Sequence, residues 1–165
     1  MFSRLILISL ISTSIFAGSK NVGDFATYSM SVMGMTANQR VEIVNVNRSS
    51  AEYSLKTTTT ISGQTDTNIE NVPTDDIMTI ENANMILANC EFMGGINETI
   101  QVMGQAKRTC KLEANSDSVF PLITKSGFHV NKNSRGFVWI GAFPVHGIAK
   151  LEMEEVTMTI QSMNW

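Results

Sequence analysis

The chain has 165 residues, of which 43% are hydrophobic and 16% are charged, and its formal net charge is −3 at pH 7. This length suits one domain with a single core. The weak negative charge argues against strong non-specific binding to nucleic acids, which depends on many Lys and Arg contacts to phosphates, and we expect no nucleic-acid partner.

The first residues have the pattern of a secretory signal peptide. Arg4 precedes an apolar run over 5–16, and the small residue Ala17 follows. The run is too short and too rich in serine for a finished transmembrane helix, which needs about 20 apolar residues. We therefore expect a signal peptide over 1–17, a single β-rich domain over 18–165, a periplasmic or secreted location and no transmembrane helix.

Alternating apolar and polar residues predict successive strands in the first half of the chain. Apolar residues alternate with Thr and Ser from Ala26 to Val32, which is typical of a half-buried strand. In the next predicted strand, 39–47, the apolar residues change phase after Ile43, which indicates a bulge or a strand covered on both faces. Two further strands, over 51–61 and 65–72, complete an antiparallel meander.

A helix is predicted after Pro73. Thr74 is a candidate N-cap, and Asp75 and Asp76 suit the first turn of a helix. Apolar residues then recur at spacings of three or four, which is typical of an amphipathic helix. The members of this stripe are Ile77, Ile80, Ala83, Leu87 and Cys90.

The two cysteines, Cys90 and Cys110, predict one structural disulfide. They lack the Cys-x-x-Cys spacing of redox-active pairs, and an exported chain favours their oxidation. Cys110 falls on the core-facing side of a predicted strand, so the bridge would join the end of the helix to the sheet. Strands are also predicted over 96–103, 107–113, 119–124, 137–140, 148–153 and 156–161.

One segment resembles a known group of proteins. A Cys110-Lys111 step precedes a strand–turn–strand that carries Trp139, Pro144, Gly147 and Lys150. These residues resemble a pattern in small exported bacterial β proteins of unassigned function. The likeness extends to the DUF3108-like group, in which a twisted antiparallel sheet resembles half of a barrel.

The strand pattern and this resemblance together predict the fold class. We expect a mainly β protein with a curved, half-barrel-like antiparallel meander sheet of about nine strands, one helix and one disulfide. The resemblance brings no catalytic residue, and it implies a concave face that holds something apolar.

Charged residues are segregated along the chain. Residues 57–106 contain acidic side chains but no Lys or Arg, and residues 118–151 contain basic side chains but no Asp or Glu. The two segments either form separate acidic and basic faces or neutralise each other as neighbours.

The sequence offers no catalytic or cofactor motif. His129 and His146 lack the spacing of zinc ligands, and the acidic stretch that starts at Asp66 lacks the required residues of a calcium loop. No serine elbow or phosphate loop is present. We therefore expect no metal, no cofactor and no enzymatic activity.

The leading functional hypothesis is an exported, non-enzymatic binding module. The chain has 11 methionines, and methionine adapts to varied apolar partners, although ordinary core packing also uses it. We expect an apolar small molecule, a lipid or a peptide to bind on the concave face. The candidate binding residues are Tyr28, Met30, Tyr53, Leu55, Met78, Met85 and Leu87.

Two alternative functions stay open. One is a structural domain that binds a protein partner and no small ligand. The other is a small eight-stranded outer-membrane β-barrel, which the aromatic residue Trp165 favours and the scarcity of Tyr and Trp opposes.

Overall fold

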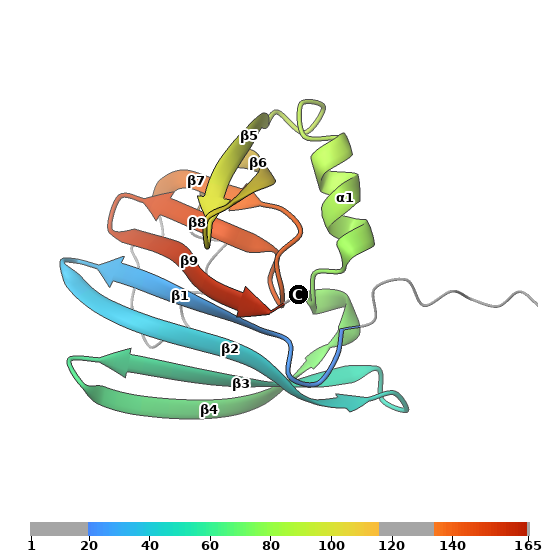
Figure 1. Ribbon diagram of the computed structural model, residues 1–165, viewed down its shortest axis with the longest axis vertical. Helices are drawn as coiled ribbons and strands as arrows, with labels where there is room; N and C mark the ends of the chain where they lie inside the picture. Colours follow the sequence, from blue (N-terminus) through green and yellow to red (C-terminus); the bar gives the residue numbers. More distant parts are fainter. Residues whose placement is uncertain (1–19, 116–133, 165) are drawn as a thin grey trace, which may run out of the picture.

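The computed structural model describes residues 20–115 and 134–164 (Figure 1), and the protein is mainly β with one α-helix in this part of the chain. The predicted signal peptide over 1–17, the predicted strand over 119–124 and His129 lie outside the described residues. The elements are β1 (Phe25–Val32), β2 (Met35–Asn47), β3 (Glu52–Ile61), β4 (Gln64–Pro73), the 3₁₀ helix η1 (Thr74–Asp76), α1 (Ile80–Ala88), β5 (Ile96–Val102), β6 (Gln105–Asn115), β7 (Arg135–Ile140), β8 (Ile148–Met153) and β9 (Val156–Asn164).

The described strands form one nine-stranded sheet in the order β4-β3-β2-β1-β9-β8-β7-β6-β5. Every neighbouring pair is antiparallel. Two meanders, β1–β4 and β5–β9, therefore meet where β1 pairs with β9 in the middle of the sheet. The sheet is not strongly curled, and its curvature is weaker than the half-barrel that the resemblance implies (Figure 1).

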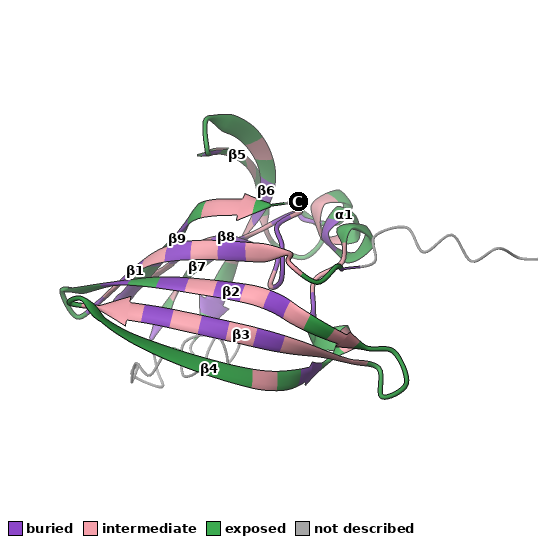
Figure 2. Ribbon diagram, turned by 60° about the horizontal axis from the view of Figure 1, so that its bottom comes forward, coloured by how far each residue is buried: buried purple, intermediate pink, exposed green. Residues whose placement is uncertain are grey.

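Burial alternates along the central strands, as the period of two in a strand requires. In β1, Ala26, Tyr28, Met30 and Val32 are buried and their neighbours are half-buried. Figure 2 shows such alternating buried bands on the central strands and an almost wholly exposed β4. The larger of two apolar clusters packs β1 against residues of β7, β8 and β9.

The second apolar cluster lies where connecting segments cover one end of the sheet. Val41, Ile43 and Leu55 supply its sheet side, and Ile77 and Val145 come from connections between elements. The pairing of β2 with β3 shifts between Ile43 and Asn45, so of the two alternatives that the phase change leaves open, the structure shows the bulge.

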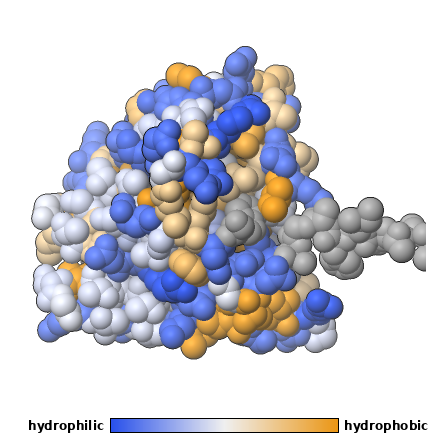
Figure 3. All heavy atoms as spheres, viewed as in Figure 1, coloured by the Kyte–Doolittle hydropathy of each residue, from blue (hydrophilic) through white to orange (hydrophobic). Residues whose placement is uncertain are grey.

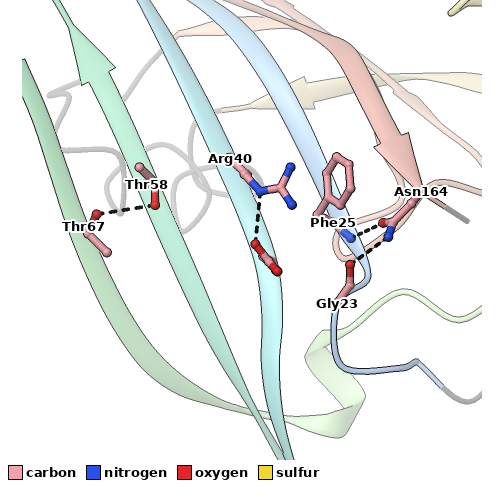
Figure 4. A network of polar contacts seen from close by, with 7 residues as sticks. Gly23, Phe25, Arg40, Thr58, Thr67 and Asn164 are labelled. Carbon is pink, nitrogen blue, oxygen red and sulfur yellow. Dashed lines mark hydrogen bonds and ion pairs between the residues drawn. The ribbon is translucent and has the colours of Figure 1, made fainter. Parts of the chain in front are cut away.

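Polar contacts hold the central strands together on the other face of the sheet (Figure 4). The Asn164 side chain accepts a hydrogen bond from the Phe25 backbone N–H at 2.7 Å and donates one to the Gly23 carbonyl at 2.8 Å. The Arg40 guanidinium lies 3.5 Å from the centroid of the Phe25 ring and forms an ion pair with Glu42. The Asn164 hydrogen bonds fasten the end of β9 to the start of β1, and the Arg40 side chain connects β2 to β1.

The predicted disulfide is confirmed. Cys90 and Cys110 are bonded, their Cα atoms are 5.5 Å apart, and both residues are fully buried. The bond joins the turn that follows α1 to β6, and α1 lies against β6 and β7. A disulfide persists in an oxidising compartment, so its presence indicates a location outside the cytoplasm.

The start of the helix differs from the prediction. Thr74 begins η1, and the N-cap of α1 is Thr79, whose hydroxyl accepts a hydrogen bond from the Asn82 backbone N–H at 3.0 Å. The backbone is extended at Ile77, and the Met78 N–H donates to the Val145 carbonyl at 2.9 Å. This long-range hydrogen bond separates η1 from α1, and local capping signals cannot reveal it.

The β5–β6 hairpin folds over the sheet. The first half of β6 pairs with β5 and the second half pairs with β7, and β5 also lies close to β9 (Figure 1). Val102 of β5 is therefore buried in the same cluster as Trp139 of β7. Neither helix among residues 20–115 and 134–164 has the length and apolar character needed to cross a membrane.

Candidate functional site

A groove of about 430 Å³ lies between η1, α1 and the loop that joins β7 to β8. This volume falls within the range of about 300–1,000 Å³ that is usual for small-molecule sites. Its apolar lining residues are Ile77, Met78, Met85, Ile86 and Met93. Its polar lining residues are Asp75, Asp76, Asn82, Asn89 and His146.

Helix α1 supplies one wall of the groove. Asn82, Met85, Ile86 and Asn89 are spaced by one, three or four residues, so they share one side of the helix. Ala83, on another side, is buried. The N-cap Thr79 and a hydrogen bond from the Asn89 amide to the Met85 carbonyl fix the two ends of this wall.

The opposite wall is built on a tightly held loop. Met78 lies against Gly147, where an added Cβ would come within 2.8 Å of the Met78 Cε atom. Gly147 has a φ of 68°, which favours glycine, and the neighbouring Val145 has a φ of 65°. A β-branched residue rarely adopts a positive φ, and such strain clusters at ligand sites.

Hydrogen bonds inside the loop keep it in this conformation. The Gly141 N–H donates to the Gly147 carbonyl at 2.9 Å, and the Phe143 and His146 N–H groups each donate to a residue two positions earlier. Val145 and Phe143 are fully buried. The loop therefore holds His146 at the groove from a fixed backbone.

The electrostatic character of the groove is acidic. Asp75 and Asp76 are exposed on its rim, and no Lys or Arg lines it among the residues that the structure describes. The rim belongs to the acidic segment 57–106, whereas His146 comes from the basic segment 118–151. An electrically neutral or cationic ligand suits this rim better than an anion.

The structure separates the candidate binding residues that the sequence suggests. Tyr28, Met30 and Leu55 are each only 1% exposed and belong to the two apolar clusters. The Tyr28 hydroxyl donates a hydrogen bond to the Ile148 carbonyl at 3.2 Å, and burial raises the pKa of this phenol. These three residues pack the interior and reach no opening of the groove.

Two of the other four candidates line the groove. Met78 and Met85 line it. Tyr53 is half-buried against the second apolar cluster, and Leu87 is half-buried on α1 without lining the groove. The groove is thus lined by α1 and its flanking connections rather than by the face of the sheet.

Sequence reasoning missed several lining residues for two different reasons. A second stripe with helical spacing starts at Asn82 and ends at Met93. It can be seen in the sequence beside the apolar stripe that starts at Ile77. The sequence does not reveal that His146 lines the groove. Its loop lies beside Met78 only in the folded chain, because the two segments are far apart in sequence.

Two further observations bear on identity. The described residues contain no group of three or more His, Cys, Asp or Glu side chains that could hold a metal ion. In comparisons with known proteins, no family model and no curated protein matches the chain. The resemblance to the DUF3108-like group therefore stays a prediction.

Proposed function

We propose that this protein is a periplasmic or secreted, non-enzymatic binding module that holds an apolar ligand in the groove beside α1. The observation that carries the proposal is the open groove itself, half of whose lining residues are methionine or isoleucine. Apolar concave sites with a few polar groups are the usual form of small-molecule sites. The disulfide supports the extracytoplasmic location.

The ligand class follows from the lining. Methionine side chains are flexible and polarizable, so they adapt to ligands of different shapes. The acidic rim disfavours an anionic head group close to the groove. A neutral alkyl chain or a neutral apolar ring fits this chemistry.

A neutral fluorescent probe tests the proposal. N-phenyl-1-naphthylamine is expected to brighten on binding to the protein, and dodecanol is expected to displace it. Met85→Glu places a charge on the apolar wall and should weaken binding by at least about tenfold, because burial of an unpaired charge is costly.

The matched control is Met35→Glu. Met35 is also an exposed methionine, but it lies on β2 and does not line the groove. It should bind the probe like the wild type. Equal binding by the Met85→Glu variant, or an equal loss in both variants, would overturn the proposal.

A second candidate function is a protein-interaction domain, and one observation favours it. Phe92, in the turn after α1, is 94% exposed, and Met93 and Ile96 are exposed beside it in the chain. Figure 3 shows small apolar spots, in orange, on the side of the molecule where α1 lies, and a larger apolar area at the bottom of the view. Exposed apolar patches mark interaction surfaces.

Photo-crosslinking distinguishes this second candidate. A benzoylphenylalanine at position 92 should give one discrete protein adduct in the exporting cell, and the same residue at the exposed position of Val22 should not. No adduct, or the same adducts at both positions, would exclude a dedicated partner surface at Phe92.

A further inference from the structure

Three methionines and one histidine line the same groove, and they come from four different places in the fold. Met78 lies between η1 and α1, Met85 on α1, Met93 in the turn after α1, and His146 in the loop between β7 and β8. The apolar ligand of the proposed function needs the methyl and methylene groups of these residues. It makes no use of their sulfur atoms or of the imidazole.

This set of donors has a specific metal chemistry. Thioether ligands are soft and select Cu(I), and imidazole is also a good copper ligand. Zinc, by contrast, favours thiolate, imidazole and carboxylate ligands, and no such cluster occurs among the described residues.

We propose that the groove binds a single Cu(I) ion through the sulfurs of Met78, Met85 and Met93 and a ring nitrogen of His146. This inference shares the groove of the proposed function but does not depend on its apolar ligand.

The mobility of the side chains and the charge of the rim support ligation. Met85 and Met93 are 59% and 49% exposed, and methionine has three rotatable side-chain bonds, so their sulfurs can turn toward a shared ion. The exposed carboxylates of Asp75 and Asp76 favour the approach of a cation.

The position of His146 is compatible with ligation. Its backbone is held by the hydrogen bond to Pro144 and by the buried neighbour Val145.

The test is anaerobic titration of the full exported protein, with its disulfide intact, against the Cu(I) complex of bicinchoninate. The wild type should withdraw one Cu(I) per chain from this coloured chelator. The variant Met78→Leu/Met85→Leu/Met93→Leu keeps the groove apolar but removes its sulfurs. It should bind Cu(I) at least about 100-fold more weakly, since even outer-sphere partners change metal affinity 10- to 100-fold.

A matched triple variant controls for methionine number. Met33→Leu/Met35→Leu/Met103→Leu removes three exposed sulfurs outside the groove and should keep the wild-type affinity. His146→Gln should weaken binding by at least about tenfold. Failure of the wild type to compete for Cu(I), or an equal loss in both triple variants, would overturn the inference.

Two readouts separate this inference from the proposed function and from misfolding. The groove triple variant should unfold in urea at the same midpoint as the control triple variant, so its loss of Cu(I) binding does not report misfolding. In wild-type protein labelled with ¹³C-methyl methionine, Ag(I) should shift the signals of the three groove methionines. Unchanged groove signals, or equal shifts at Met33, Met35 and Met103, would contradict the site without any variant.

Discussion

At the scale of single residues, Trp139 is a buried aromatic residue whose neighbours include charged side chains. It is 3% exposed, and its Nε1–H donates to Glu98 at 2.7 Å. The ammonium groups of Lys111 and Lys150 lie 4.9 and 4.7 Å from its ring centroid, within the range of cation–π attraction. Glu98 comes from β5, so this contact helps to hold the β5–β6 hairpin over the sheet.

Replacement of Glu98 should therefore destabilise the fold. Glu98→Ala leaves the buried indole N–H without its acceptor and should lower the free energy of unfolding by about 1–3 kcal/mol. Glu98→Gln keeps an acceptor oxygen and should recover most of the loss. Urea titration measures both effects, with the exposed Glu113→Ala on β6 as control. An equal loss for Glu98→Ala and Glu113→Ala would show that the indole contact contributes nothing.

Tyr28 predicts a dependence of stability on alkaline pH. Burial raises its pKa above the ordinary value of 10.0, so above that pH the unfolded chain releases a proton that the folded chain keeps. The folded state then binds more protons, and the free energy of unfolding falls as the pH rises. This contribution is fully present below pH 10 and is lost progressively above it.

Lysines also titrate at alkaline pH, but they do so in both the wild type and Tyr28→Phe. The difference in stability between these two proteins therefore reports the ionisation of Tyr28. The variant should lose about 0.5–1.5 kcal/mol at neutral pH, because its hydrogen bond to the Ile148 carbonyl is gone. The difference between the two proteins should shrink above pH 10. A difference that stays constant across this range, measured by urea unfolding, would contradict the assignment.

At the scale of elements, the disulfide links α1 to the sheet and so supports the groove. The cross-link spans a sequence separation of 20 residues, and closure of such a loop stabilises a fold by about 3 kcal/mol in the chain-entropy model. Cys90→Ala/Cys110→Ala should lower the free energy of unfolding by about this amount. It should also weaken binding of N-phenyl-1-naphthylamine, because α1 supplies one wall. Loss of stability without loss of binding would show that α1 keeps its place without the bond.

The elements also show what sequence patterns can and cannot predict. The alternation in β1 and β3, the bulge after Ile43 and the disulfide were all readable, because each depends on local periodicity or on the only two cysteines. The local sequence predicts Thr74 as the N-cap of the helix, but the N-cap of α1 is Thr79, because a hydrogen bond from Met78 to the distant Val145 separates η1 from α1.

The same limit applies to the groove. Its α1 wall follows a helical stripe in the sequence, but its other wall depends on how the loop around His146 folds back. Tyr28, Met30 and Leu55 have the alternation of a ligand-facing sheet, yet the same alternation is typical of a packed core. Only the three-dimensional structure separates these two meanings.

At the scale of the whole molecule, the two meanders depend on one central junction. β1 pairs with β9 along its whole length, and this pairing alone joins β1–β4 to β5–β9 within the described sheet. The junction is buried on one face and fastened by Asn164 at its end. The edge strand β4, by contrast, is exposed at nearly every residue.

This arrangement predicts a gradient of local stability across the sheet. Amide groups in β1 and β9 should exchange with deuterium only on global unfolding, whereas those of β4 should exchange through local opening, because few buried apolar contacts hold that strand. Hydrogen exchange followed by mass spectrometry of peptic fragments measures the difference. Opening of β4 breaks mainly its hydrogen bonds to β3, so the central strands should stay protected from exchange when β4 opens. If β4 were protected as strongly as β1, the sheet would unfold as one cooperative unit, and the exposed edge would have no independent mobility.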